Sequence, residues 1–182
     1  MSEGKRGRGA GPPVLIGWNE YVDLPDWGVR GLRAKVDTGA RSSALHVEGI
    51  RELPRGRVRF DVILDRRKSH RKVRVETRIL RRGRVRSSSG QYTTRIFVAT
   101  RLVLGPVERV IEVSLVDRGP MIFRMLLGRT ALAGAFWIDV GHRALFGRPD
   151  RHGHRRGVHP QPKLSRRGTQ ASPGSSSSES SS

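Results

Sequence analysis

The stretch Ala34-Lys-Val-Asp-Thr-Gly-Ala-Arg-Ser-Ser-Ala-Leu45 places an Asp-Thr-Gly turn between two apolar segments. An alternating run over residues 29–36 leads into the turn, and a second apolar segment, 44–47, leaves it. Such a loop, tightened by Gly39, presents the carboxylate of Asp37 at the end of a strand. The same residues also form ordinary β-turns, because Asp and Gly favour turns for conformational reasons. Taken alone, the motif favours the ordinary turn, so the rest of the chain has to decide.

Short apolar or alternating segments fill most of the chain between residues 14 and 146. Alternation of apolar and polar side chains is typical of half-buried antiparallel strands. We therefore expect extended segments at residues 14–22, 29–36, 58–64, 73–80, 92–104, 109–116 and 122–127, with 136–140 and 143–146 closing the domain. Residues 128–134, which are bounded by glycines, fit one or two helical turns. The pattern predicts an all-β fold, a small closed barrel with one short helix, rather than a βαβ protein.

The composition predicts one domain over residues 14–150, flanked by disordered tails at 1–13 and 151–182. The Gly, Arg, Pro and Ser of these tails cannot bury enough apolar area to offset chain entropy. No apolar run approaches the roughly 18 residues of a membrane-spanning helix, and the N-terminus lacks the apolar core of a secretory signal. We therefore expect a cytoplasmic protein without a membrane partner. The absence of cysteine excludes disulfides, thiolate catalysis and cysteine metal ligands.

The basic charge is concentrated in the middle of the chain. The formal net charge is +20, and residues 51–109 hold 18 basic and 5 acidic side chains. Such a field attracts polyanions and acidic partners and accelerates their encounter at low salt. Nucleic acid and acidic peptides are therefore both candidates. A compositional origin is the alternative, because arginine outnumbers lysine 31 to 5, as GC-rich coding would produce.

A second motif lies far downstream of the Asp-Thr-Gly turn. Leu126 and Leu127 are followed by Gly128 and Arg129, at the start of the predicted helical turn. The two motifs in this order resemble a retropepsin-type aspartic protease, in which the Asp-Thr-Gly loop packs against a hydrophobic-hydrophobic-Gly strand. In that family Gly-Arg opens the short helix that follows. The resemblance implies a single-lobe acid-protease fold with Asp37 as the catalytic carboxylate.

A closer resemblance covers residues 14–146. It is carried by segments 17–25, 34–46 and 117–129, above all by the residues around the Asp-Thr-Gly turn. They are similar to the bacterial retropepsin-like family long labelled ATP-dependent zinc proteases. Some members of that family accompany ATP-grasp ligases that add glutamates to protein C-termini.

The residues themselves do not support zinc or ATP. The chain has no H-E-x-x-H string and no G-x-x-x-x-G-K-[ST] loop. His46, His70 and His142 are scattered along the predicted domain, and the remaining histidines lie in the C-terminal tail. We therefore expect neither a metal nor a nucleotide cofactor.

An aspartic protease needs two carboxylates that share one proton. This chain has a single Asp-Thr-Gly, and its other aspartates lack the Thr/Ser-Gly context. The resemblance therefore implies a two-fold symmetric homodimer that cuts peptides with Asp37 from each copy. It also implies that Thr38 hydrogen-bonds across the dyad, that Gly39 lets the substrate backbone approach, and that Arg129 braces the loop. Ala40 and Gly128 complete the expected loop support.

Arg41 departs from the family pattern. Retroviral enzymes commonly carry an acid shortly after Asp-Thr-Gly-Ala that pairs with the arginine of the second motif, and here Arg41 follows Ala40. Arg41 either faces the cleft and favours acidic substrates or lies in solvent. The flap over the substrate is also open: strand order favours residues 65–71, and the polar loop 81–90, which contains glycines, is the alternative.

Two other functions are compatible with the sequence. A nucleic-acid-binding β-barrel could use the Arg-rich middle, but only Phe60, Tyr92 and Phe97 lie there as stacking platforms, so this reading is not favoured. A retropepsin fold could also persist as a non-catalytic interaction module. An aspartic endopeptidase acting on peptides, acidic ones among them, remains the leading hypothesis.

Overall fold

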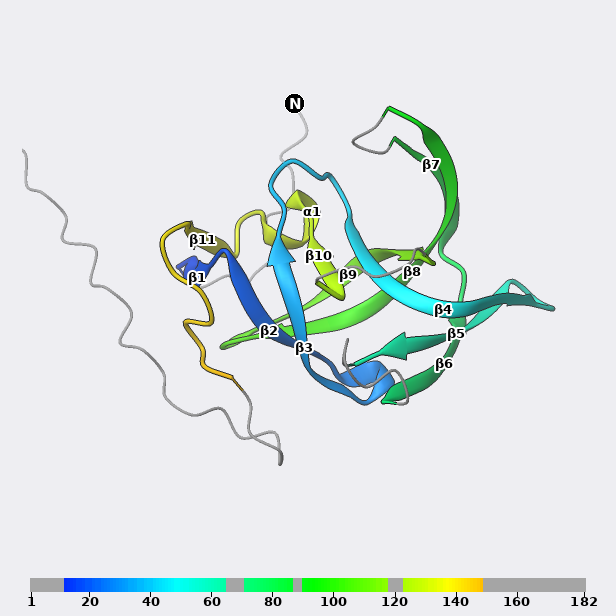
Figure 1. Cartoon of the computed structure of the whole chain (residues 1–182), viewed down its shortest axis with the longest axis horizontal. Coiled ribbons are helices and arrows are strands. Elements are labelled where there is room, and N and C mark those ends of the chain that lie inside the picture. Colours follow the sequence, from blue (N-terminus) through cyan, green and yellow to red (C-terminus); the bar gives the residue numbers. More distant parts are fainter. Residues whose placement is uncertain (1–11, 65–70, 87–89, 118–122, 149–182) are drawn as a thin grey trace, which may run out of the picture.

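The computed structural model describes residues 12–64, 71–86, 90–117 and 123–148. Most of these residues lie in strands, and the only helical elements among them are one α-helical turn and one 3-10 turn (Figure 1). In chain order the elements are β1 (Val14–Gly17), β2 (Asn19–Leu24), η1 (Pro25–Trp27), β3 (Val29–Val36), β4 (Ser43–Leu53), β5 (Arg57–Ile63), β6 (Lys72–Arg78), β7 (Arg81–Arg86), β8 (Tyr92–Leu104), β9 (Val107–Val116), β10 (Met125–Leu127), α1 (Arg129–Leu132) and β11 (Phe136–Asp139).

The main sheet closes on itself through β10. This short strand pairs with β3 on one side in parallel and with β4 on the other side in antiparallel. The order β10–β3–β2–β8–β9–β4 returns to β10, so six strands form a ring. The all-β prediction is confirmed, and the predicted closure takes the form of this ring. A separate parallel pair, β1 with β11, lies beside it.

Alternating side chains fill the ring with its core. In β3 the residues Leu32, Ala34 and Val36 are buried, whereas Arg33 and Lys35 between them are exposed. Burial of such side chains is the main stabilising term of a small β domain, at roughly 1.5–3 kcal/mol for each large one. The largest fully buried apolar side chains come from strands all around the ring and from the adjoining β1 and β5: Ile16, Leu24, Leu32, Leu45, Phe60, Ile63, Phe97, Leu102, Leu104, Met125 and Leu127.

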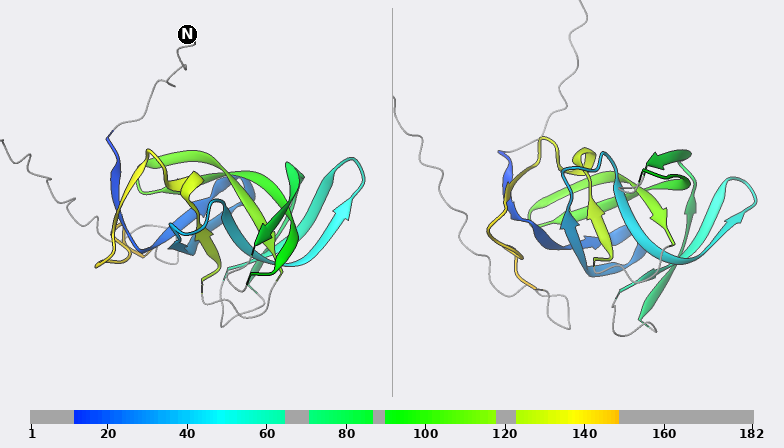
Figure 2. Two further views of the ribbon diagram at one scale, coloured as in Figure 1. Left: turned by 90° about the horizontal axis from the view of Figure 1, so that it is seen from above. Right: turned by 45° about the horizontal axis from the view of Figure 1, so that its top comes forward.

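Two arms extend from the ring. In the first, the far half of β4 pairs with β5, which pairs with β6. The register of β4 and β5 shifts between Glu48 and Arg51, around Gly49, whose φ of +63° favours glycine. In the second arm, β7 pairs with the first half of β8 (Figure 2). The first half of the 13-residue β8 thus pairs within this arm, and its second half pairs within the ring.

Three local predictions were wrong. Residues 81–86 were expected in a polar loop, yet they form β7, which pairs with β8 from Arg81↔Phe97 to Arg86↔Tyr92. Arg81 lies over the Phe97 ring at 3.6 Å and pairs with Glu112, so a charged segment gains tertiary partners that its composition does not reveal. The segment 14–22, expected to be continuous, breaks at Trp18. Residues 143–146 close the domain without forming a strand.

Several other expectations fall outside the described residues. The predicted tails, apart from Pro12 and Pro13, belong to this group, as do the connections 65–70 and 87–89. Among the described residues, no helix is both long and apolar enough to cross a membrane.

Candidate functional site

The ring brings the two sequence motifs into contact. Leu127 of β10 lies opposite Val36 of β3, and Leu126 lies opposite Ala44 of β4. Since Asp37 follows Val36 directly and Gly128 follows Leu127, the Asp-Thr-Gly loop and the Leu-Leu-Gly-Arg segment leave the sheet side by side. The packing of these two segments, which the resemblance implied, is confirmed.

Backbone hydrogen bonds join the loop to the second segment. The amide of Asp37 donates to the Leu127 carbonyl at 2.9 Å. In return the amide of Arg129 donates to the Ala40 carbonyl at 2.9 Å, and that of Thr130 donates to the Arg41 carbonyl at 3.0 Å. These bonds use the polar groups at the start of α1, which would otherwise lack partners. The loop therefore has a conformation set by a segment about 90 residues away.

Gly128 is required by the close approach of the two segments. A Cβ at this position would lie 2.5 Å from the carbonyl carbon and oxygen of Ser42 and 2.9 Å from the Arg41 oxygen. Those contacts are backbone atoms, which cannot move aside without opening the loop. The Gly128 amide donates to the Ser43 hydroxyl at 3.2 Å, and Ser43 is fully buried. The close backbone contact that fixes the loop against the second segment is therefore at Gly128.

Only one of the two carboxylate oxygens of Asp37 accepts hydrogen bonds from described residues of the same chain. Its Oδ1 accepts hydrogen bonds from the amides of Gly39 and Ala40, both at 3.2 Å. Its Oδ2 accepts none from the residues that the structure describes. The side chain is partly buried and lies at the end of β3. One oxygen is therefore oriented by the loop, while the other is available to a second group.

Arg129 contacts the loop through its side chain. Its Nη1 donates to the carbonyls of Thr38 and Gly39, each at 2.9 Å. This arrangement explains how the loop tolerates Arg41 in place of an acid, since the guanidinium of Arg129 binds backbone oxygens instead. Arg41 itself is exposed and forms no ion pair with any described residue.

Two other aspartates of the described chain, Asp61 and Asp139, have partners of their own. A hydrogen bond from Arg74 holds the pKa of Asp61 below its usual range, helped by Lys72. The amide of Gly141 and the ring of His142 lower the pKa of Asp139 in the same way. No second carboxylate among the residues described contacts Asp37.

The two histidines that the structure describes, His46 and His142, have different surroundings. His46 is buried on β4, where burial, and secondly Arg124, lowers its pKa. His142 bonds to Asp139 at 2.8 Å, and His70 lies outside the described residues. Within the described ranges no three His, Asp or Glu side chains are placed to hold a metal ion.

The two candidate flap hairpins lie on different sides of the molecule. Their tips, 65–70 and 87–89, are outside the described residues. The strands show that β7 and β8 reach the side on which the β3–β4 loop lies, at the top of Figure 1, whereas the β5–β6 connection leaves from the opposite side. The described strands of the β7–β8 hairpin are thus on the same side of the molecule as the candidate site.

Sequence reasoning missed two buried polar groups that support this region. Ser43 links β4 to both Gly128 and Ser114, whose hydroxyl donates to the Ser43 carbonyl at 3.1 Å. Glu20 is fully buried, and its Oε1 accepts from the amides of Gly17 and Leu145. Both residues fall within the segments that carried the family resemblance. Nothing in their spacing, however, indicated that their side chains would be buried and hydrogen-bonded.

Comparisons with known proteins agree with this architecture. The chain is 35% identical over 129 residues to a "Probable alpha-L-glutamate ligase" from Parasynechococcus marenigrum, covering 69% of this chain and 28% of that protein. A protein with the same name from Shewanella halifaxensis is 32% identical over 136 residues, covering 73% and 30%. The chain therefore spans less than a third of these curated relatives.

A solved structure is also similar. It is a protein of unknown function from Legionella pneumophila, with a TM-score of 0.60 and 27% identity over 72% of this chain and 96% of that one. The family model described as "Retropepsin-like aspartic endopeptidase RimB" matches residues 15–149. That range runs from the second residue of β1 to beyond β11 and includes both motifs of the candidate site. The chain belongs to the RimB-like family of retropepsin-like proteins.

Proposed function

We propose that this protein is an aspartic endopeptidase whose active site forms between two copies of the chain. The observation that carries the proposal is the Asp37 loop, which is held by Leu127 and Arg129 while the Oδ2 of Asp37 has no partner within the described chain. A rigid loop that presents one free carboxylate oxygen is what a shared-proton dyad requires.

The proposed reaction uses one ionised and one protonated carboxylate. The ionised Asp37 removes a proton from water as the water oxygen attacks the peptide carbonyl carbon. The protonated Asp37 of the partner subunit gives its proton to the carbonyl oxygen, so a neutral tetrahedral diol forms. The Asp37 that took the water proton then gives it to the amide nitrogen as the C–N bond breaks. A hydroxyl of the diol returns its proton to the Asp37 of the partner subunit as the carbonyl re-forms, so the dyad again holds a single proton. The two carboxyls titrate as a pair.

A homodimer is the simplest source of the second carboxylate, because a two-fold axis brings identical loops together. Two exposed apolar side chains lie shortly after α1, the helical turn that begins at Arg129. Trp137 is 48% exposed and Val140 is 82% exposed. Apolar side chains of this size are suited to burial against a second copy.

Acidic peptides are the proposed substrates. Arg41 is exposed, free of ion pairs within the described chain and four residues from Asp37. The relatives named as glutamate ligases point to the same acidic chemistry. Ligase activity is not proposed for this chain, since the match spans under a third of those proteins and the family description is that of an endopeptidase.

The test is digestion of a peptide library by the wild type, by Asp37→Asn and by Asp117→Asn. Asp117 is an exposed carboxylate without a hydrogen bond in the described structure, so its amide variant is the matched control. We expect Asp37→Asn to lose activity by about a thousandfold or more, and Asp117→Asn to retain it. Full activity of Asp37→Asn would sink the mechanism.

Mixing the subunits tests the shared site. With equal amounts of wild type and Asp37→Asn and free exchange, only about one quarter of the dimers are wild type on both sides. Activity per wild-type chain is then about half that of the pure enzyme. Activity that follows the wild-type concentration linearly would contradict a two-chain site. Dimers that turn over no peptide would indicate an interaction module.

A further inference from the structure

Strand β6 forms an open edge away from the Asp37 loop. It pairs with β5 over its whole length, from Ile63↔Lys72 to Arg57↔Arg78. In the described structure no strand pairs with its other side. An unpaired edge presents a row of backbone donors and acceptors that a further strand can use.

Two hydrogen bonds show which backbone groups face this edge. The amide of Leu64 donates to the Arg71 carbonyl, and the amide of Ile79 donates to the Gly56 carbonyl. In an antiparallel pair the bonded residues recur at every second position. The odd-numbered residues from Val73 to Thr77 therefore bond to β5. The amides and carbonyls of the even-numbered ones, Lys72, Arg74, Glu76 and Arg78, point outward.

The same even-numbered residues carry their side chains on an exposed, strongly basic face. Cross-strand register extends this face over β5 and β4, where Arg59 lies opposite both Glu76 and Arg51. Six cations share it with three acids: Arg51, Arg57, Arg59, Lys72, Arg74 and Arg78, with Glu48, Asp61 and Glu76. Arg51 and Arg78 form no ion pair with described residues, and the side chain of Arg74 is 69% exposed although it bonds to Asp61.

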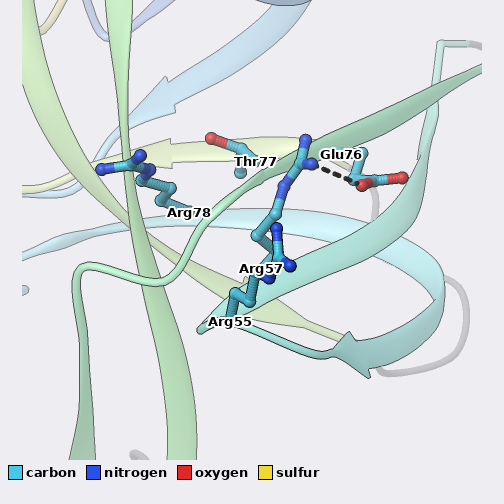
Figure 3. A pocket seen from close by; sticks show the side chains of 5 residues that line it. All are labelled: Arg55, Arg57, Glu76, Thr77 and Arg78. Atoms are coloured by element: carbon cyan, nitrogen blue, oxygen red, sulfur yellow. Dashed lines mark ion pairs between the residues drawn. The ribbon is translucent and has the colours of Figure 1, made fainter.

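Surface hollows lie on this face. One of about 500 Å³ is lined by Arg55, Arg57, Glu76, Thr77 and Arg78 (Figure 3). In it Glu76 pairs with Arg57 at 3.1 Å, and neither Arg55 nor Arg78 forms an ion pair with a residue that the structure describes. A second hollow, of about 260 Å³, lies between Arg51, Arg59 and Arg74, among others. Side chains of an added strand would therefore find both space and charge.

We propose that the β6 edge binds an extended acidic segment of a partner protein as an added strand. Directly opposed residues of neighbouring strands point to the same face, and alternate residues are spaced at roughly 7 Å. Carboxylates at every second position of the added strand would thus meet Lys72, Arg74 and Arg78. The backbone edge supplies the hydrogen bonds and the cations select an acidic sequence. The inference is independent of chemistry at Asp37.

A peptide fits this face better than a nucleic acid does. Single-stranded nucleic acids require aromatic rings on which bases stack. The aromatic side chain of this part of the sheet, Phe60, is only 1% exposed and packs against Trp27. Outward amides alternating with carbonyls match a polypeptide backbone, whereas a phosphate chain offers acceptors only.

The experiment measures fluorescence anisotropy with a labelled peptide of about ten residues in which Glu and Thr alternate, long enough to cover β6. The same Glu-Thr peptide with every backbone nitrogen methylated has the same charge but cannot donate to a β-ladder. We expect the Glu-Thr peptide to bind more tightly, and Arg78→Glu to weaken its binding about tenfold at roughly 0.15 M salt. Arg143→Glu, the same charge change at an exposed residue after β11, should alter it less than about twofold.

Amide hydrogen exchange on the wild type gives a readout that needs no variant. The Glu-Thr peptide should increase the protection of the amides of Lys72, Arg74, Glu76 and Arg78. Equal binding of the two peptides, or binding without that protection, would overturn the proposal. Tighter binding of a single-stranded oligonucleotide of equal charge would also overturn it and assign the face to nucleic acid.

Discussion

The Asp37 loop and the β4–β5–β6 arm are stabilised in different ways. The loop is held mainly by backbone groups, with amides and carbonyls of residues 37–41 paired to 127–130 across the ring. The outer face of the arm is held by side-chain ion pairs, such as Arg74 with Asp61 and Arg59 with Glu76. Both regions contain β4, which starts beside the loop and ends in the arm.

This difference has a physical consequence. A Cβ on Gly128 would lie only 2.5 Å from the Ser42 backbone, so the loop is sensitive to small changes of shape. Exposed ion pairs are each worth roughly 0–1 kcal/mol and are screened by salt, so the arm tolerates substitution. A catalytic loop needs a closely fixed shape. A charged docking face can be built from exposed ion pairs that tolerate substitution.

Gly128→Ala should have the largest effect. The added methyl group meets the Ser42 backbone at 2.5 Å, so the loop must open or the protein loses roughly 3 kcal/mol or more of its free energy of unfolding. Urea unfolding measures this loss. Gly134→Ala is the control, because a Cβ there meets nothing within 4 Å and costs only the strain of φ +73°, about 1 kcal/mol. Equal losses would refute the steric account.

Arg129→Met should have the next largest effect. It removes two hydrogen bonds to the carbonyls of Thr38 and Gly39 while keeping the apolar stem. We expect a loss of about 1–2 kcal/mol in unfolding free energy, and a larger proportional loss of peptidase activity. Arg41→Met, at an exposed arginine without an ion pair in the described structure, should change stability by less than about 0.5 kcal/mol. If both variants behave alike, Arg129 does not brace the loop.

Asp61→Asn tests the arm. It weakens the pairs with Arg74 and Lys72, and we expect a loss of about 1 kcal/mol that shrinks near 1 M salt. The pKa of Asp61 is lowered in the folded protein, so its stabilisation is present above the ordinary aspartate value and disappears as pH falls through the folded pKa. Thermal unfolding at two salt concentrations and at several acid pH values measures this. A salt-independent loss would show that the pairs are not screened.

His46→Gln should have the smallest effect, confined to a pH window. Burial lowers the pKa of His46 on β4, so the unfolded chain binds a proton more readily than the folded one. Wild-type stability should therefore fall as pH drops from neutral through about 6.5, by less than about 1 kcal/mol. The variant should show a flatter slope over that window in denaturant titrations. Identical slopes would mean that His46 does not titrate differently on folding.

Much of the architecture was predictable from local patterns. The span of β8 was predicted, and β3 was identified from the alternation of residues 29–36. The paired motifs around Asp37 and Gly128 were visible because each is a short contiguous string. In contrast, β7 carries four arginines in six residues, and nothing local distinguishes it from a loop. It becomes a strand because Phe97 and Glu112 offer Arg81 a ring and a carboxylate.

Strand content and the identity of the two motifs were determined by the sequence alone, because side-chain alternation and short strings act over a few residues. Only the tertiary structure decided that β10 closes the ring, that Ser43 ties down Gly128 and that the β7–β8 hairpin lies on the side of the Asp37 loop. It also decided that the even-numbered residues of β6 face an open edge. The physical reason is that these properties depend on hydrogen-bond partners from distant segments, which pair only once the chain has folded.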